Sequence, residues 1–317
     1  MEPPVHLSVV SPVYQAEGTV DELVKRLLVV LPSITKDFEI ILVEDGSQDQ
    51  GWSKIEAQCK SYPEVIGVRL SRNFGQHSAI SAGLNLAKGK WVVVMDCDLQ
   101  DRPEEITALY QKANEGYDMV LASRIKRQDT YFKHFFSKLF YKFLSFLTGS
   151  KCDNSIANFG VYHRSVIDAI MQMPEKIRFF PAMVNWVGFN KTTIPVEHGK
   201  RFEGESAYNF YKELKLAVDI MLAYSNKPLK MIIGLGGFVS VVAFAFGFFI
   251  LCRSLMGSVL ISGYASLIVS IAFFSGVMIS VLGVVGLYIG KIFEGIKDRP
   301  IYLIKEKMNV ENQTDTV

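Results

Sequence analysis

The sequence has few cysteines, and none is spaced as disulfide scaffolds or common metal sites require. Its 317 residues include four cysteines, and no two of them form a CxxC pair. The five histidines match neither the HExxH pattern nor the spacing of zinc fingers. These absences exclude a disulfide-rich scaffold and favour reduced thiols in a cytosolic setting.

The chain also lacks a large excess of charge and the composition of a disordered or fibrous protein. Its 34 basic and 32 acidic residues leave a net charge of +2, so nothing in the overall charge calls for nucleic acid as a partner. Only 24 glycines and 11 prolines are present, and 49% of the residues are hydrophobic, as in a folded chain. The first six residues lack the basic start and apolar stretch of a signal peptide.

Two long stretches lack charge altogether. Residues 231–251 and 255–290 contain no Asp, Glu, Lys or Arg, and the mean hydropathy of the whole chain is +0.21. About 20 apolar residues cross a bilayer core, so we predict two transmembrane helices, at about 231–252 and 264–289, within residues 229–290. A pair of buried core helices is the alternative. Small residues that would let membrane helices approach closely are Gly234, Gly236, Gly237, Gly276, Gly283, Gly286 and Gly290.

Basic residues flank this pair of helices on one side. Lys227 and Lys230 precede it and Lys291 follows it, whereas the linker carries only Arg253. By the positive-inside rule both flanks lie in the cytoplasm. We therefore expect an integral protein of the inner (cytoplasmic) membrane, with the N-terminal domain, the tail over residues 291–317 and both termini on the cytoplasmic side.

Residues 1–205 alternate between apolar strands and amphipathic helices. The strand-like runs are residues 5–10, 38–43, 65–70, 91–95 and 119–122. The first helix is expected over residues 18–31. Near-continuous apolar strands separated by helices predict an α/β domain with a mostly parallel sheet that is covered on both faces. Ligands of such sheets bind at the carboxyl ends of the strands.

Carboxylates gather at two of these strand ends. Asp45 follows the second strand, and Asp96 and Asp98 follow the fourth. On an extended backbone Asp96, Asp98 and Gln100 point to the same side. Their oxygen atoms are the kind of ligand that Mg²⁺ and Mn²⁺ prefer.

Each of these acidic segments also has an ordinary structural explanation. Asp45 would close a turn in which Gly46 supplies a positive φ. Asp101, together with Pro103, would begin a helix over residues 104–113. The residues alone leave both explanations open.

Five motifs occur in a fixed order at the strand ends: Ser11–Tyr14, Val43–Ser47, Ser71–Gln76, Asp96–Asp101 and Ser123–Arg124. Together they resemble the family 2 glycosyltransferases, which have the GT-A fold. Within that family the chain is similar to the polyisoprenyl-phosphate glycosyltransferases, the group of bactoprenol glucosyltransferases and dolichol-phosphate mannose synthases. The resemblance covers residues 7–210, and the two C-terminal spans are similar to those of the bacterial branch.

The resemblance implies where a nucleotide-sugar donor binds. Pro12, Tyr14 and Glu17 would border the nucleotide pocket, and Asp45 would hold the uridine or guanosine part. Arg124 would bind donor or acceptor phosphate, for which its planar fork of donors is suited.

The resemblance also implies a metal and a reaction. Asp96 and Asp98, with Gln100, would hold Mg²⁺ or Mn²⁺ and the donor diphosphate, and with Arg124 these aspartates are the catalytic candidates. An ionised oxygen of polyprenyl phosphate would attack the anomeric carbon, and the nucleoside diphosphate would leave with inversion. We expect a UDP-sugar as donor and undecaprenyl rather than dolichyl phosphate as acceptor, whereas the sequence does not name the sugar.

One segment departs from the pattern of the family. Many relatives carry an acidic residue where this chain has Asn158, and an arginine where it has Gly160. Asparagine cannot act as a base. The open explanations are that an already ionised phosphate needs no base, that Asp153 serves instead, or that the sugar is not glucose.

Two segments are expected to contact membrane lipids. Residues 131–147 form a basic amphipathic helix rich in phenylalanine, and residues 206–228 form a second one. By resemblance the loop that begins at Arg201 closes over the donor and the lipid phosphate, with Arg201, Ser206 and Arg127 on the acceptor side. Core-facing packing of the first helix and an ordinary basic loop are the alternatives.

Other functions compete with this interpretation. A processive polysaccharide synthase would carry a Gln-x-x-Arg-Trp motif, and none is present. A non-catalytic nucleotide-binding membrane scaffold would not require the intact Asp96, Asp98 and Arg124. A transporter is disfavoured because the two spans offer no polar path. Relatives lead us to expect a homo-oligomer.

Overall fold

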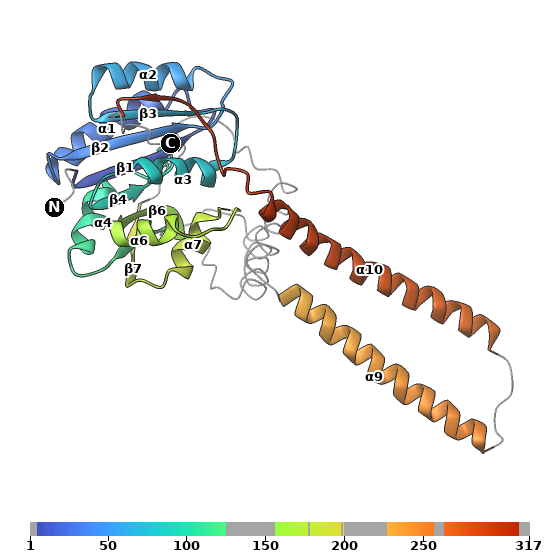
Figure 1. Cartoon of the computed structure of the whole chain (residues 1–317). Coiled ribbons are helices and arrows are strands. Elements are labelled where there is room, and N and C mark those ends of the chain that lie inside the picture. Colours follow the sequence, from blue (N-terminus) through green and yellow to red (C-terminus); the bar gives the residue numbers. More distant parts are fainter. Residues whose placement is uncertain are drawn as a thin grey trace. The chain divides into compact units, whose positions relative to one another are not determined.

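The computed structural model describes residues 5–124, 156–176, 178–197, 199, 227–256 and 263–310. The chain forms two compact units, one of residues 1–142, 150–209 and 300–317 and the other of residues 143–149 and 210–299. The first unit contains the sheet, and the second contains two long helices (Figure 1). The predicted helix over 131–147, and all but the last two residues of the one over 206–228, lie outside the described residues.

The described strands of the first unit form one eight-stranded mixed sheet. They are β1 Leu7–Val13, β2 Phe38–Glu44, β3 Val65–Leu70, β4 Trp91–Val94, β5 Met119–Arg124, β6 Ile156–His163, β7 Lys191–Val196 and β8 Ile304–Met308. In space they follow the order β7-β5-β6-β4-β1-β2-β3-β8. β4, β1, β2 and β3 are parallel neighbours, β5 is parallel to β7, and β6 and β8 run antiparallel to their neighbours.

The predicted mostly parallel α/β sheet is confirmed, and all five predicted strands are present. No pattern in the sequence predicts β6, β7 or β8. The helices of this unit are α1 Val20–Val30, α2 Gly51–Ser61, α3 Gln76–Leu86, α4 Glu105–Ala113, α6 Arg164–Met171 and α7 Phe180–Trp186. The helix predicted over residues 18–31 is therefore α1, with a short 3-10 turn after it.

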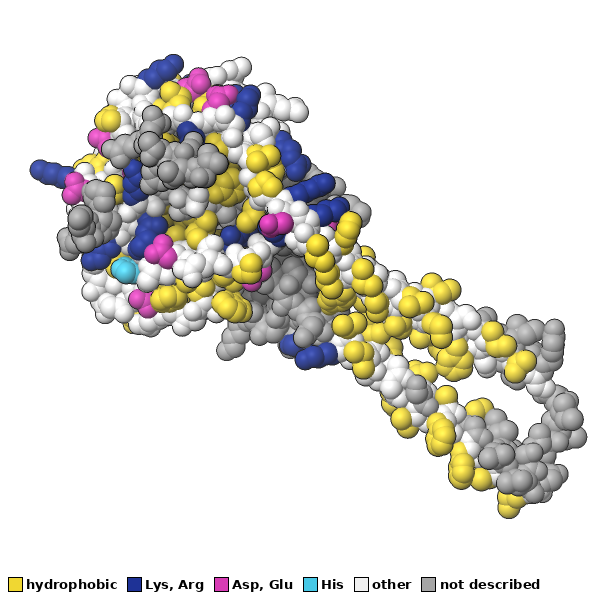
Figure 2. Space-filling view, in the orientation of Figure 1, with side chains coloured by type: hydrophobic (Ala, Val, Ile, Leu, Met, Phe, Trp, Pro, Cys, Tyr) yellow, Lys and Arg dark blue, Asp and Glu magenta, His cyan; other side chains and the backbone are white. Residues whose placement is uncertain are grey.

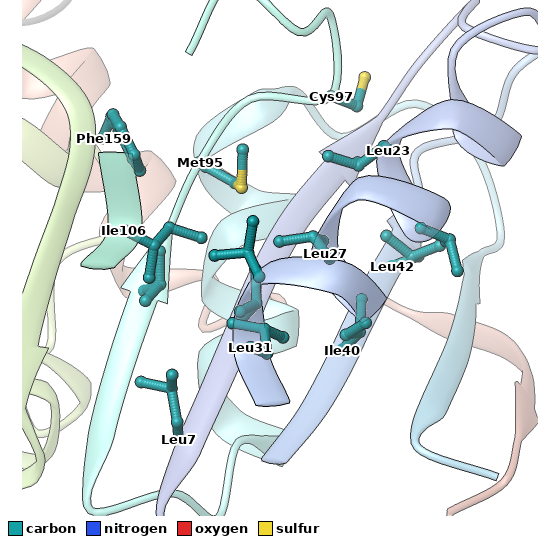
Figure 3. Close-up of a cluster of buried hydrophobic side chains, with 14 of the residues drawn as sticks. Leu7, Leu23, Leu27, Leu31, Ile40, Leu42, Met95, Cys97, Ile106 and Phe159 are labelled. Atoms are coloured by element: carbon teal, nitrogen blue, oxygen red, sulfur yellow. The ribbon is translucent and has the colours of Figure 1, made fainter. Parts of the chain in front are cut away.

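Helices cover both faces of the sheet, and each face has its own apolar cluster. Val9 of β1 faces the cluster formed with α1, α2 and α4, part of which Figure 3 shows. Its neighbour Val10 faces the cluster formed with α3, α6 and α7. Each large apolar side chain buried in this way contributes about 1.5–3 kcal/mol, so burial on both faces stabilises the strands whose ends carry the loops of the candidate site.

The second unit contains the two predicted apolar helices, α9 Lys227–Leu255 and α10 Tyr264–Ile296. Windows over Leu229–Phe246 and Phe273–Ile296 are long and apolar enough to cross a membrane, and 0% of either window is buried. Figure 2 shows apolar side chains along both helices. The alternative of buried core helices does not fit this exposure, and the two helices indicate association with a membrane.

The sequence suggests that these seven glycines let membrane helices approach closely, and between α9 and α10 they make no such approach. A Cβ atom added at any of the seven would meet no other described atom within 4 Å. They do not mediate close contact between α9 and α10.

The end of the chain is not the simple tail that the sequence suggests. Residues 300–310, which we call the strap, return to the first unit, and β8 within them pairs with β3 at the edge of the sheet. The side-chain amide of Asn309 donates to the carbonyls of Cys59, Tyr62 and Val65 at 2.6–3.3 Å. Asn309 is therefore anchored to the loop before β3, whereas residues 311–317 lie outside the described part of the chain.

Candidate functional site

The carboxyl ends of three neighbouring strands, β1, β2 and β4, lie side by side. β1 lies between β2 and β4, and the three strands are parallel, so their carboxyl ends point the same way. The N–H of Asp45 donates to Val13 O at 2.9 Å, and the N–H of Met95 donates to Val10 O at 3.1 Å. Both acidic loops therefore leave the sheet directly beside the end of β1.

The loop after β4 keeps the alternation that the sequence predicts. Along residues 95–100 the odd-numbered side chains are buried in the apolar cluster, where Figure 3 shows Met95 and Cys97. Asp96, Asp98 and Gln100 are partly exposed. This holds although β4 ends at Val94 and Leu99 has a positive φ of 59°. The two carboxylates therefore lie on the exposed side of the loop.

Cys97, between the two aspartates, is a packing residue. It is buried in the apolar cluster that covers one face of the sheet. Burial raises the pKa of this thiol to about 12, and the neighbouring charges of Asp96 and Asp98 add to the effect. At neutral pH it is a protonated, buried thiol and therefore a poor nucleophile.

The donors of this loop fit a hard divalent cation that shares its coordination with a ligand. Asp96 and Asp98 supply carboxylates, and Gln100 supplies an amide oxygen; its own N–H donates to Asp98 Oδ1 at 3.1 Å. Among the described residues no group of three or more His, Cys, Asp or Glu side chains could hold a metal. Such a set suits Mg²⁺ or Mn²⁺, which commonly binds through one or two carboxylates plus substrate phosphates.

Asp45 holds the loop after β3 in place. Its Oδ1 accepts the N–H of Phe74 at 2.7 Å, and its Oδ2 accepts the N–H of Gly75 at 2.9 Å. Burial raises the pKa of Asp45 to about 6, although these two hydrogen bonds oppose the change. At pH 7 the carboxylate is therefore mostly ionised. The positive φ predicted for Gly46 is present, at 66°.

The loop after β1 is tied to the loop after β2. The N–H of Gln15 donates to Ser47 Oγ at 3.0 Å. The N–H of Glu17 donates to Asp49 Oδ2 at 3.1 Å, and Glu17 Oε2 accepts the N–H of Gln50 at 2.7 Å. Tyr14 and Glu17 are exposed at this edge, where a nucleotide could contact them. Pro12 is buried within β1 opposite Val43, so its side chain does not face solvent.

The chain just beyond β7 contacts the loop after β4. Arg124 ends β5 opposite Val196 of β7, and its side chain is not described. Just beyond β7, Glu197 pairs with Arg102, and the N–H of Gly199 donates to Gln100 O at 2.9 Å. No sequence pattern predicts these two contacts.

The remaining acceptor-side candidates are not among the described residues. Arg127, Asp153, Arg201 and Ser206 all lie outside them. Their proposed roles therefore stay predictions from the sequence.

The absence of an arginine at position 160, in β6, has a steric basis. A Cβ at Gly160 would lie 2.8 Å from Val120 O and 3.1 Å from the hydroxyl of Tyr162. That hydroxyl donates to the backbone carbonyl of Asn158 at 3.2 Å. Position 160 in this chain therefore has no room for an arginine.

The capping explanation for Asp101 is wrong. α4 begins at Glu105, and its N-cap position is Glu104, three residues further on. Asp101 is instead buried, directly after residues 95–100 of the loop that follows β4. Its carboxylate therefore does not share the exposed side of the loop with Asp96 and Asp98.

Gln76 is a functional candidate that the sequence did not single out, although it ends one of the five motifs. Its Nε2 donates to Asp96 Oδ1 at 2.6 Å. We expect Gln76→Ala to raise the Mn²⁺ concentration required for half-maximal nucleotide binding about tenfold, because Asp96 loses a fixed orientation. Calorimetric titration of UDP at several Mn²⁺ concentrations measures this.

The matched control for this prediction is Gln58→Ala. Gln58 Nε2 donates to Asp21 Oδ1 at 2.7 Å, a bond of the same type between α2 and α1. An equal change in metal requirement in both variants would show that Gln76 has no special role at Asp96.

Comparison with known proteins places these loops in a family context. Residues 8–171, just over half of the chain, match the family model described as Glycosyl transferase family 2. An uncharacterized glycosyltransferase of Synechocystis sp. is 38% identical over 97% of this chain and 97% of its own length.

Two further relatives carry a more specific name. The undecaprenyl-phosphate 4-deoxy-4-formamido-L-arabinose transferase of Shewanella sediminis is 35% identical, over 95% of this chain and 92% of its own. That of Edwardsiella ictaluri is 36% identical, over 98% of this chain and 96% of its own.

Solved structures show a more distant likeness. Mannosyltransferase PcManGT from Pyrobaculum calidifontis, in complex with GDP-Man and Mn²⁺, aligns with 95% of this chain and 89% of its own at 13% identity and a TM-score of 0.47. A likeness at this level says nothing about the ligands of the present chain.

Proposed function

The chain belongs to glycosyl transferase family 2, and on that premise we propose that it transfers one sugar from a UDP-sugar to undecaprenyl phosphate. The observation that carries this proposal is the match to relatives named as undecaprenyl-phosphate sugar transferases, which extends over at least 95% of this chain. The match therefore includes the apolar helices as well as the sheet. A long lipid acceptor is consistent with a catalytic unit attached to two such helices.

The donor binds across the loops at the ends of β1, β2 and β4 in this proposal. The nucleoside lies beside Tyr14 and Asp45, and Asp96 and Asp98 face the diphosphate. Gln100 completes the set of oxygen donors for a divalent cation, which, when bound, neutralises charge on the leaving nucleoside diphosphate.

The reaction is a single displacement at the anomeric carbon. An oxygen of the lipid phosphate forms the new bond as the bond to the donor diphosphate breaks, so the configuration inverts. Arg124 and Arg201 are proposed to hold the phosphates, since guanidinium forks bind phosphate in a bidentate manner. A phosphate monoester is already mostly ionised at pH 7, with a second pKa of about 6, so Asn158 in place of a carboxylate does not block the reaction.

The location follows from the same proposal. The two apolar helices span the cytoplasmic membrane, and the basic residues at their outer flanks keep the sheet and both ends of the chain on the cytoplasmic side. Donor sugars made in the cytoplasm then reach the site directly. The lipid phosphate lies in the same membrane leaflet.

The proposed function is tested by lipid incorporation of label from a donor panel. Purified full-length protein in bilayer nanodiscs with undecaprenyl phosphate and Mg²⁺ or Mn²⁺ is given UDP-4-deoxy-4-formamido-L-arabinose, UDP-glucose, UDP-N-acetylglucosamine or GDP-mannose. We expect one UDP-sugar to label organic-extractable lipid, with the formamido sugar as first candidate given the names of the relatives. Label in a polymer, or in no product from any donor, would overturn the proposal.

A further inference from the structure

The strap contacts the candidate site through a shared arginine. Arg69 of β3 is 30% exposed and lies between two carboxylates: its Nε is 3.4 Å from Glu44 Oε2, and its Nη1 is 3.6 Å from Glu306 Oε1. Glu44 is the last residue of β2 and is 1% exposed, whereas Glu306 belongs to β8 and is 40% exposed. A carboxylate as buried as Glu44 requires a compensating charge, and the strap helps to orient the guanidinium that supplies it.

Glu44 is connected by hydrogen bonds to two loops of the site. Its Oε1 accepts the N–H of Ser47 in the loop after β2. Ser47 Oγ in turn accepts the N–H of Gln15 in the loop after β1, at 3.0 Å. A series of contacts through Arg69 and Glu44 therefore connects Glu306 to both loops that carry the proposed nucleoside-binding residues.

A second connection reaches the loop after β3. The carbonyl of Leu303 accepts the N–H of Ser71, the first residue of that loop, at 2.9 Å. Asp45 holds the other end of the same loop through Phe74 and Gly75. The loop is thus fixed at one end by the strap and at the other by Asp45.

Apolar packing supports the same arrangement. Tyr302 and Ile304 of the strap pack against the apolar cluster that also receives Phe74 from the loop after β3. These contacts lie on both sides of Ser71, which is itself exposed. The strap is therefore built into the edge of the sheet beside the site.

We propose that the strap is a positioning segment for the donor pocket, and that Glu306 is the positioning residue that acts through Arg69 and Glu44. In this proposal the affinity for the donor depends on a segment that follows α10 and is far from the donor loops in the sequence. This inference rests on the proposed function in naming a nucleotide donor. The restraint on the loops is a property of the protein without ligand, so it can be measured separately.

The test compares Glu306→Gln with Lys307→Gln in the full-length protein. Lys307 is an exposed residue of the same strand, and it is the better control because Lys305 lies 3.7 Å from Glu306. We expect Glu306→Gln to raise the donor KM about threefold, the size expected for a partly exposed ion pair. The kcat and the KM for the lipid stay unchanged, Glu306→Asp restores part of the affinity, and Lys307→Gln has no effect.

Amide hydrogen exchange without ligand supplies the second readout. The amide of Ser47 should exchange faster in Glu306→Gln than in Lys307→Gln. The amide of Ser71 should exchange faster in Asn309→Ala than in Lys307→Gln. Equal exchange and equal donor KM in all three variants would overturn the inference. If no donor is ever turned over, faster exchange and weaker UDP binding in Glu306→Gln would still support the strap while the proposed function fails. If Glu306→Gln lowers both kcat and the melting temperature, the role of Glu306 is only structural and the inference is overturned.

Discussion

Asp98→Ala is expected to lower turnover by about a thousandfold or more, the largest effect of any single change in the proposed site. Asp98 lies on the exposed side of the loop after β4, and its Oδ1 already accepts the N–H of Gln100. Removal of this carboxylate eliminates one of the two acidic oxygen ligands proposed for the cation. The leaving diphosphate then keeps charge that would otherwise be neutralised.

The measurement is the initial rate of lipid labelling at saturating donor, with UDP binding followed in parallel. Asp37→Ala, which removes an exposed aspartate before β2, is the matched control for loss of one negative charge. A turnover in Asp98→Ala within tenfold of the wild-type value would contradict the assignment. Equal UDP affinity with and without Mn²⁺ in the wild-type protein would do so as well.

Gly46→Ala is expected to weaken donor binding about a hundredfold or more. A Cβ at Gly46 would lie less than 3.0 Å from the backbone of Arg72 and Asn73, and its φ is 66°. The loop after β3 must move away to make room. That movement breaks the hydrogen bonds from Phe74 and Gly75 to Asp45. The loop after β2 and the loop after β3 are then both displaced from the donor pocket.

Gly116→Ala separates this clash from ordinary backbone strain. Gly116 also has a positive φ, 98°, but an added Cβ would meet nothing within 4 Å. We expect Gly116→Ala to lower the free energy of unfolding by about 1 kcal/mol, with no change in donor affinity. Isothermal titration with UDP and thermal melting distinguish the two variants. A Gly46→Ala protein with wild-type UDP affinity would show that the loop contact does not shape the pocket.

The parts of the fold that the sequence predicts are those with a strong local pattern. The parallel strands are almost continuously apolar because helices cover both their faces. The alternation around Asp96 and Asp98 is equally local, since every second side chain is anchored in the core. These features required no knowledge of distant contacts.

The parts that the sequence does not predict depend on residues far apart in the chain. β8 reads Ile-Lys-Glu-Lys-Met, a short charged strand that becomes recognisable only beside β3. Asp45 and Phe74 are 29 positions apart, and Gln76 and Asp96 are 20 apart. No periodicity predicts such pairs, so the sequence does not predict the hydrogen bonds of Asp45 to the loop after β3 or the contact between Gln76 and Asp96.

The mass of the lipid product tests the central claim most directly. Purified full-length protein is incubated with undecaprenyl phosphate, the active UDP-sugar and Mn²⁺, and the lipid extract is analysed by mass spectrometry. We predict one product, a lipid monophosphate that carries a single sugar and is absent with Asp98→Ala. A lipid diphosphate would mean that a sugar phosphate is transferred instead. That outcome, a ladder of several sugars, or a lipid of unchanged mass would contradict the account.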